Sequence, residues 1–163
     1  PDEKKPEMTP SDLYFFHRHL DFGGKLIRIN KPLVIYRHVS GSVCSRIPRR
    51  QLLRARLDPF QRRVLCDWKQ FTIWGAGRDG KNFYNDLPEE SRDKVVAFCD
   101  IDEKKIKRGY HDSRRRKIVP VVHFSQAKPP IVICVAMGRS GGALERNIAS
   151  LGLKEGIGYW HFI

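Results

Sequence analysis

Cysteine is scarce in this chain, and long hydrophobic runs are missing. The 163 residues include four cysteines, at positions 44, 66, 99 and 134, with no Cys-x-x-Cys pair. This excludes a small disulfide-stapled scaffold and predicts reduced thiols in a cytoplasmic protein, with Cys99 and Cys134 buried in apolar runs. No apolar stretch approaches the roughly 18 to 20 residues that span a bilayer, so we expect no membrane insertion. The start of the chain is polar and lacks Met, from which we expect it to be the tail of a longer chain.

Negative charge is also in short supply. Against 31 Lys and Arg stand 18 Asp and Glu, which leaves a net charge of +13. Residues 46–63 contribute +6 and residues 104–117 contribute +7, so the rest of the chain is neutral. Lys and Arg gain affinity for polyphosphates by displacing condensed counterions. Two such tracts favour a nucleic-acid partner, although a solvated surface explains either tract alone.

Apolar spacing in the first part of the chain predicts short separate elements. A helix is expected over 12–20, ended by two glycines, and strands are expected over 26–29 and 33–36 on either side of an Asn-Lys-Pro turn. From 49 to 68, apolar residues recur at three- and four-residue spacing. This predicts one or two basic linking helices, interrupted by Pro59.

From residue 70 onward, strand-like and helical segments alternate. The predicted strands cover 71–74, 94–99, 118–124, 131–136 and 159–163, and the predicted helices cover 79–87 and 141–151. Apolar β-branched runs separated by helices imply a parallel sheet covered on both faces. The predicted fold class is therefore α/β, with a Rossmann-like parallel sheet in the C-terminal part.

A glycine-rich motif follows the first of these strands. Gly75, Gly77 and Gly80 form Gly-x-Gly-x-x-Gly, and Asp100 follows Gly80 by twenty residues, at the end of the next strand. Such glycines permit a tight turn and close approach of a pyrophosphate, and the acid can accept hydrogen bonds from a ribose. The four residues are candidate nucleotide-binding residues. Close strand–helix packing is the alternative explanation for the glycines, and Asp79 within the loop would repel a phosphate.

Three other patterns have sufficient local explanations. Asp100 and Asp102 spell Asp-x-Asp, a metal-binding pattern elsewhere, but here they close a Rossmann-type strand and we interpret the match as coincidence. The glycine cluster at 138–142 is interpreted as a turn and helix cap, with a place in the same crevice as the alternative. Thr9 to Asp12 have the pattern of a helix start, in which Asp12 completes a capping box.

Taken together, these segments resemble a known family. Residues 12–20, 23–25 and 33–37 are similar to the last part of a family 2, GT-A-type glycosyltransferase domain. Residues 71–77, 95–102, 129–135 and 150–156 resemble the C-terminal region of the beta-N-acetylglucosaminyltransferase-like family of queuosine-tRNA galactosyltransferases. The likeness covers nearly the whole chain.

The resemblance implies inverting transfer of galactose from UDP-galactose to queuosine in a tRNA anticodon. It makes Asp12 the general base that takes the acceptor hydroxyl's proton. It also places Arg37 and His38 near the leaving diphosphate, although the family has another residue between the two. A divalent metal, Mn²⁺ or Mg²⁺, is implied in the full-length enzyme. Because the donor- and metal-binding N-terminal half is not in this sequence, we expect the chain alone to be inactive and to hold no metal.

The resemblance divides the chain into three parts. These are a GT-A remnant over 1–48, a basic helical linker over 49–69, and a non-catalytic Rossmann-like accessory domain over 70–163. tRNA is the expected partner, with its phosphates held by the basic tracts, while the UDP-sugar binds through the missing half. The predicted phosphate contacts are Arg49, Arg50, Arg54, Arg62, Arg63, Arg114, Arg115, Arg116 and Lys117.

Two alternatives stay open at this point. One is a Rossmann module that binds NAD or a nucleotide sugar in a regulatory or redox role. The other is a non-catalytic interaction domain whose glycine loop serves only packing.

Overall fold

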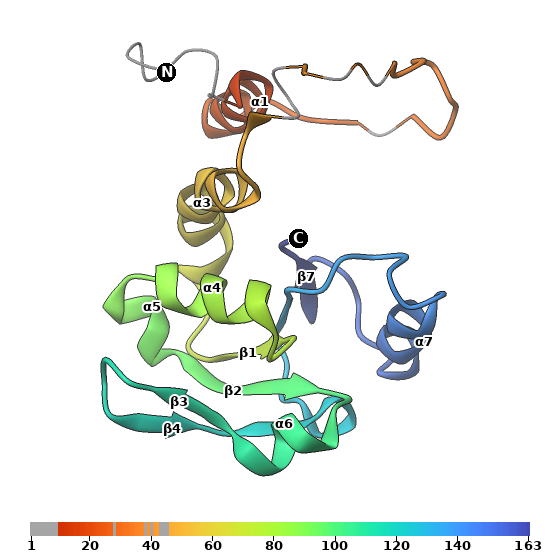
Figure 1. The fold of residues 1–163 in the computed structure, drawn as a ribbon. Coiled ribbons are helices and arrows are strands. Elements are labelled where there is room, and N and C mark those ends of the chain that lie inside the picture. The colour runs from red at the N-terminus through yellow and green to blue at the C-terminus, as the bar shows by residue number, and fades with distance from the viewer. Residues whose placement is uncertain (1–9, 28, 38, 40, 43–45) are drawn as a thin grey trace. The chain divides into compact units, whose positions relative to one another are not determined.

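The chain forms two compact units, Pro1–Pro59 and Phe60–Ile163 (Figure 1). The computed structural model describes residues 10–163 except 28, 38, 40 and 43–45. Within this described part, no helix is both long enough and apolar enough to cross a membrane.

The first unit contains the predicted N-terminal helix. Helix α1 spans Ser11–Asp21 and carries Asp12 in its first turn. The helix ends as expected at the glycine pair: Gly23 adopts a φ of +79°, and the Gly24 N–H donates to the His19 carbonyl at 2.9 Å. A left-handed residue closes a helix in this way, and only glycine adopts that conformation without steric cost.

The two strands predicted at 26–29 and 33–36 are not formed by the described residues of these segments, so this prediction is wrong. The apolar side chains there are exposed to solvent, Ile27 to 88%, Val34 to 82% and Ile35 to 98%. A strand is stable only when a neighbouring strand satisfies its backbone and a packed face covers its side chains. The β-forming sequence is present, but the described residues around it supply no partner strand.

The predicted linking helix is continuous across Pro59. Helix α3 spans Arg49–Phe60 with Pro59 inside it, and a π-helical turn, η2, follows directly over Gln61–Leu65. Because proline has no N–H to donate, it removes one bond of the α-helical ladder. In the π-helical turn that follows, the Cys66 N–H donates to the carbonyl of Gln61, five residues back, at 2.9 Å. The helix is therefore not interrupted at Pro59 as expected. It continues, and its hydrogen bonds change from four-residue to five-residue spacing.

The second unit is built on a five-stranded parallel sheet, which confirms the predicted α/β, Rossmann-like class. Its strands are β1 (Phe71–Trp74), β2 (Val95–Asp100), β5 (Val121–His123), β6 (Ile131–Ile133) and β7 (Tyr159–His161), in the order β5-β2-β1-β6-β7. All four strand pairs are parallel. The chain runs outward from β1 to β5 and then returns past β1 to β6. The order of the sheet therefore reverses between β1 and β6.

The single strand predicted over 118–124 is divided in two. Strand β4 (Lys117–Val119) pairs antiparallel with β3 (Tyr110–Asp112) in a separate hairpin. Pro120 follows, and only then does β5 join the parallel sheet. The sequence run ends in a short 3-10 helix, η3 (Phe124–Gln126). Proline cannot donate to a ladder, and here it separates two strands that belong to different sheets.

Helices cover both faces of the parallel sheet. Helix α4 (Arg78–Asp86) packs on the face of Ile73 and Phe98, with the Tyr84 ring 5.6 Å from that of Phe98. Helix α7 (Ala143–Ser150) packs on the opposite face, where Leu144 and Ile148 join a buried cluster with Trp74, Cys99, Ile131 and Ile133. Figure 1 shows α4 beside α5 (Glu89–Asp93) along β1 and β2, with α7 away from them near β7. Helix α6 (Glu103–Arg108) follows β2 directly.

Candidate functional site

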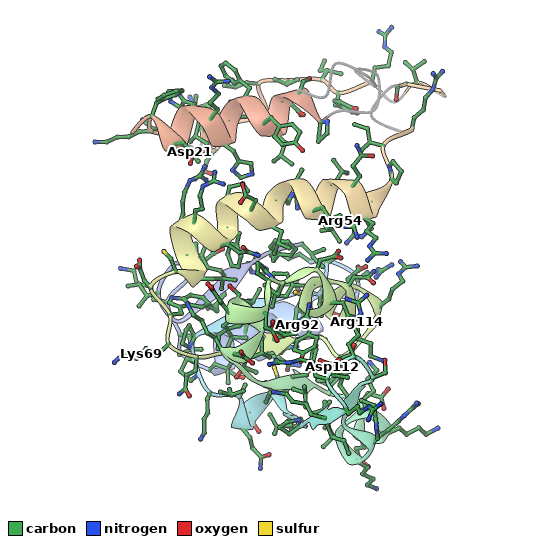
Figure 2. All side chains as sticks on the ribbon, turned by 90° about the vertical axis from the view of Figure 1, so that its left-hand side faces the viewer. Asp21, Arg54, Lys69, Arg92, Asp112 and Arg114 are labelled. Atoms are coloured by element: carbon green, nitrogen blue, oxygen red, sulfur yellow. The ribbon has the colours of Figure 1, made fainter. Side chains whose placement is uncertain are left out.

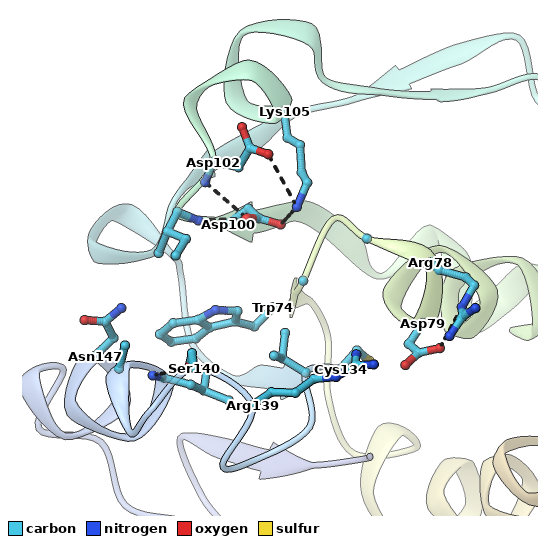
Figure 3. A pocket seen from close by; sticks show the side chains of 16 residues that line it. Trp74, Arg78, Asp79, Asp100, Asp102, Lys105, Cys134, Arg139, Ser140 and Asn147 are labelled. Carbon is cyan, nitrogen blue, oxygen red and sulfur yellow. Dashed lines mark hydrogen bonds and ion pairs between the residues drawn. The ribbon is translucent and has the colours of Figure 1, made fainter. Parts of the chain in front are cut away.

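A pocket of about 650 Å³ opens at the carboxyl ends of β1 and β6 in the second unit (Figure 3). This is the point at which the strand order reverses, where open α/β sheets bind their ligands. Trp74, Val135 and Leu144 give it an apolar wall, and Arg139, Ser140 and Asn147 add polar groups opposite the end of β2. We refer to this pocket as the crevice.

The glycine motif divides into two roles. Gly75 and Gly77 line the crevice, whereas Gly80 does not. A Cβ atom on Gly80 would lie 1.9 Å from the carbonyl oxygen of Gly75, so this glycine lets α4 pack directly on the end of β1. A Cβ atom on Gly77 would meet nothing within 4 Å. Close packing of α4 on β1 therefore explains why residue 80 is a glycine. At Gly77 the backbone borders open space, so a ligand can approach it there.

Asp100 lies at the expected end of β2, but its carboxylate already has partners. It is 7% exposed. Its Oδ2 accepts hydrogen bonds from the Ala76 N–H and from Lys105 Nζ, both at 2.9 Å, and its Oδ1 accepts from the N–H groups of Ile101 and Asp102. A carboxylate has about four acceptor positions. Asp100 therefore ties the glycine loop to the start of α6 and has little capacity left for a ribose.

The Asp-x-Asp sequence has a structural role of the same kind. The Asp102 side chain caps α6 by accepting from the Lys104 N–H at 2.9 Å. Lys105 Nζ lies 3.8 Å from Asp102 and 2.9 Å from Asp100, as the dashed lines in Figure 3 show. The Lys105 ammonium group disfavours a divalent cation at this place, because it repels the cation and already pairs with the carboxylate of Asp100. In the described part of the chain, no group of three or more His, Cys, Asp or Glu residues is arranged to hold a metal ion.

The second glycine cluster both caps a helix and lines the crevice, which unites the two interpretations of the sequence. Ser140 Oγ accepts from the Leu144 N–H at 3.2 Å, and Gly142, at a φ of +80°, precedes α7. Glu145 Oε1 accepts from the Gly138 N–H at 2.7 Å. This hydrogen bond is the largest influence that lowers the pKa of Glu145. The sequence did not predict this role of Glu145, because its hydrogen-bond partner is a backbone N–H, which no pattern of side chains indicates.

The crevice carries balanced charge. Arg78, Lys105 and Arg139 stand against Asp79, Asp100 and Asp102. Cys99 and Cys134, which lines the crevice, are buried, as the sequence predicted. This burial raises the pKa of both thiols and makes them poor nucleophiles. The arrangement suits binding of a partly apolar ligand better than covalent chemistry or capture of a highly charged diphosphate.

The residues assigned to glycosyl transfer lie in the first unit. Asp12 is exposed in the first turn of α1, and its Oδ1 accepts from the N–H of Leu13 at 2.8 Å. The residue before α1 is Pro10, without a side-chain capping bond, and Thr9 lies outside the described residues. Arg37 is exposed, and His38 also lies outside the described residues.

The predicted phosphate contacts differ in their surroundings. Exposed members are Arg49, Arg50, Arg54, Arg62, Arg114, Arg116 and Lys117, and Arg63 is half-buried. Arg115 is an exception, because its Nη2 bonds the carboxylate of Asp93 and lies 4.0 Å from Glu89. Its hydrogen bond to Asp93 is the main influence that raises the pKa of Arg115. We therefore assign Arg115 to the internal structure of the second unit.

Three other predicted phosphate contacts, Arg114, Arg116 and Lys117, lie at the turn of the β3–β4 hairpin, which the buried Asp112 stabilises. Asp112, 2% exposed, accepts hydrogen bonds from Tyr84 Oη and from the N–H groups of Arg114 and Arg115. Figure 2 marks Asp112 and Arg114 on the same side of the second unit. Since Asp112 holds the turn from inside, the side chains of Arg114, Arg116 and Lys117 remain exposed at its tip.

No protein-family model matches this chain, and no solved structure matches it.

Proposed function

We propose that this chain is part of a glycosyltransferase that transfers a sugar, galactose from UDP-galactose, to queuosine in tRNA. In this proposal residues 1–48 belong to the GT-A catalytic domain and 49–69 form a basic linker. The Rossmann-like sheet that follows is a non-catalytic accessory domain that grips tRNA. The observation that carries the proposal is the hairpin tip, where Arg114, Arg116 and Lys117 are exposed on a turn held by Asp112. Contacts of this kind position an RNA without reading its sequence.

The first unit supports the same proposal through its exposed apolar segments. Residues 26–29 and 33–36 have strand-forming sequences, and their described apolar side chains are exposed, as Ile27 and Ile35 illustrate. Such segments pair when a neighbouring sheet is supplied. The N-terminal half of a GT-A domain is the neighbour that the family resemblance provides.

Asp12 is the residue to which the proposal assigns the chemistry. An exposed carboxylate at the start of α1 is open to an acceptor hydroxyl, from which it takes the proton as the hydroxyl attacks the sugar. Arg37 is assigned to the side of the leaving diphosphate, together with His38. The divalent metal and the uridine pocket are assigned to the half of the enzyme that this chain does not contain.

RNA binding is tested on this chain by gel-shift titration with tRNA at increasing salt. We expect binding that weakens steeply as salt rises, because each neutralised phosphate releases a counterion. An Arg114→Ala, Arg116→Ala, Lys117→Ala triple variant should bind more weakly, by about tenfold or more at 50 mM salt. Lys69→Ala, Lys128→Ala, Lys154→Ala is the matched control, since it removes the same charge from exposed positions elsewhere in the second unit. Equal losses in both variants, or no binding at low salt, would reject the tRNA-gripping role.

The catalytic assignment is tested in the longer protein that this proposal requires, with a transferase half upstream of Pro1. Asp12→Asn should lower the rate of galactose transfer to queuosine-containing tRNA by about 10²-fold or more, which is the usual contribution of a general base. Asp21→Asn, at the other end of α1, is the control and should keep the rate. An active Asp12→Asn enzyme, or an upstream sequence without a transferase half, would overturn the assignment.

A second candidate function is nucleotide binding in the crevice. Its position at the reversal of strand order and its apolar wall favour this function, whereas the occupied carboxylate of Asp100 and the balanced charge place it second. Calorimetric titration of the chain with NADH and with UDP-galactose tests it. Saturable binding of either compound would favour the nucleotide module, and heats equal to dilution for both would remove it.

A further inference from the structure

A smaller pocket of about 220 Å³ is lined by residues of α4, of α6 from Lys104 to Arg108, and of the start of β3. Four of its eight lining residues are Lys or Arg, and none is acidic. We call it the basic pocket. It is separate from the crevice, although Lys105 lines both.

The fold brings these cations together from separate elements. Lys81 comes from α4, and Lys104 and Arg108 lie four residues apart on α6, which places them on one face of that helix. Gly109 ends α6 at a φ of +69°, and a Cβ atom there would lie 2.9 Å from Ile118 Cγ2. A glycine is therefore required for the turn that brings Tyr110 and His111 to the wall of the pocket.

Three of the four cations of the basic pocket have no carboxylate partner among the residues that the structure describes. Lys105 is paired with Asp100 at 2.9 Å (Figure 3). Among the described residues, by contrast, no carboxylate oxygen lies within 4.0 Å of the charged nitrogens of Lys81, Lys104 or Arg108. Lys81 Nζ lies over the Tyr110 ring at 5.6 Å, a contact that retains its charge. Three cations without a carboxylate partner repel one another. An anion bound between them attracts all three and so outweighs their mutual repulsion.

The volume of the basic pocket limits the size of the anion that it can bind. Pockets for drug-sized ligands enclose about 300 to 1,000 Å³, and at about 220 Å³ the basic pocket is smaller. A multiply charged, compact oxyanion fits both the volume and the charge. Arginine presents a fork of donors that matches phosphate oxygens, and lysine binds phosphate as a point charge.

We propose that the basic pocket is a phosphate-binding site formed by Lys81, Lys104 and Arg108. The phosphate is supplied either by the backbone of an RNA or by free phosphate or pyrophosphate. The site does not depend on the glycosyltransferase assignment, because the exposed hairpin tip and Asp12 contribute nothing to it.

Calorimetric titration of the chain with pyrophosphate and with inorganic phosphate, at low salt, tests the site directly. We expect saturable binding of pyrophosphate, weakened about tenfold or more by Lys104→Ala with Arg108→Ala, since each removes a charge-assisted contact. Lys107→Ala is the matched control, because Lys107 stands on the same helix, pairs with Glu103 at 3.9 Å and does not line the basic pocket. All substituted side chains are partly or fully exposed, and circular dichroism confirms folding.

Competition separates the two sources of phosphate. If pyrophosphate displaces tRNA in the gel shift, and the double variant weakens tRNA binding, the site holds an RNA phosphate. If pyrophosphate binds but neither effect on RNA occurs, the site holds a free phosphate, and the proposal stands even where the tRNA assignment fails. The proposal is overturned if the folded chain binds neither phosphate nor pyrophosphate and the double variant leaves RNA binding unchanged. It is equally overturned if Lys107→Ala causes the same loss as the double variant.

Discussion

The carboxylate of Asp100 accepts a hydrogen bond from the backbone N–H of Ala76 at 2.9 Å. This hydrogen bond joins the end of β2 to the middle of the glycine loop after β1. The same carboxylate oxygen also accepts a hydrogen bond from Lys105 Nζ of α6. The acid that a dinucleotide-binding protein presents to its cofactor is here part of the framework of the crevice. That relationship determines what the glycine motif does in this protein.

Removal of the Asp100 carboxylate should destabilise the second unit. Asp100→Ala leaves three backbone N–H groups and the Lys105 ammonium without their acceptor. We expect a loss of about 2–4 kcal/mol in the free energy of unfolding, measured by urea denaturation. Glu103→Gln, which changes an exposed carboxylate in the same segment, should stay within about 0.5 kcal/mol. Equal stability of Asp100→Ala and the wild type would show that these hydrogen bonds contribute nothing.

The two later glycines of the motif should respond differently to alanine. Gly80→Ala forces a Cβ atom to within 1.9 Å of the Gly75 carbonyl oxygen, and we expect a loss of about 3 kcal/mol or more. Gly77→Ala meets open space and should cost less than about 1 kcal/mol in thermal or urea unfolding. If Gly77→Ala also abolishes binding of a nucleotide that the wild type binds, the loop approaches that ligand. Similar stabilities of the two variants would contradict the packing role of Gly80.

The Tyr84–Asp112 hydrogen bond should make stability depend on pH at both extremes. Burial, and then Asp112, raises the pKa of Tyr84 to about 12. Burial acts to raise the pKa of Asp112, but the hydrogen bonds from Tyr84 and from two backbone N–H groups outweigh it, so that this pKa lies below 3.8. The contribution of Asp112 is therefore present above about pH 4 and is lost as pH falls through its folded pKa. The contribution of Tyr84 is present below pH 10 and is lost as pH rises towards 12.

Tyr84→Phe provides the test of this pair. It should cost about 1.5–3 kcal/mol at pH 7, because a buried carboxylate loses a donor, and less in acid once Asp112 is protonated. Absorbance titration of the five tyrosines should show one that ionises near pH 12 in the wild type and is missing from the variant. A variant whose stability deficit is the same at pH 2 and pH 7 would contradict the assigned role of Asp112.

The cysteines of the second unit should differ in reactivity. Cys66 is exposed, whereas Cys99 and Cys134 are buried and their thiol pKa values are raised. A thiol reagent such as DTNB should therefore modify Cys66 in the folded chain and reach the other two only on unfolding. The measurement uses Cys44→Ser, with and without Cys66→Ser. Rapid labelling of the doubly substituted chain under native conditions would show that the face of the sheet against α7 opens to solvent.

The sequence was sufficient where neighbouring residues decide the structure. The helix over 12–20, the glycine stop after it and the alternation of strands and helices beyond residue 70 follow from apolar spacing and turn chemistry, and the structure confirms them. The sequence misled where a distant partner was needed. The strands at 26–29 and 33–36 have strong β propensity, but propensity does not supply the neighbouring strand that their backbone requires.

The candidate sites divide along the same line. The positions of Gly75, Gly77 and Asp100 at the ends of adjacent strands were predictable, because spacing along the chain determines them. Tertiary contacts determine the rest. The Asp100 carboxylate accepts hydrogen bonds from Ala76 and Lys105, and Arg115 forms an ion pair with Asp93. The basic pocket was equally beyond prediction, since Lys81 is separated from Lys104 by a complete strand and two helical segments.

By itself, the sequence determined which segments form helices and parallel strands in the second unit, where the glycine loop falls, and that positive charge gathers in two tracts. Only the tertiary structure decided which charged groups are already neutralised and which remain open to a ligand. The physical reason is that periodicity and turn formation depend on residues a few positions apart, whereas charge pairing and burial depend on groups that meet only after the sheet has assembled.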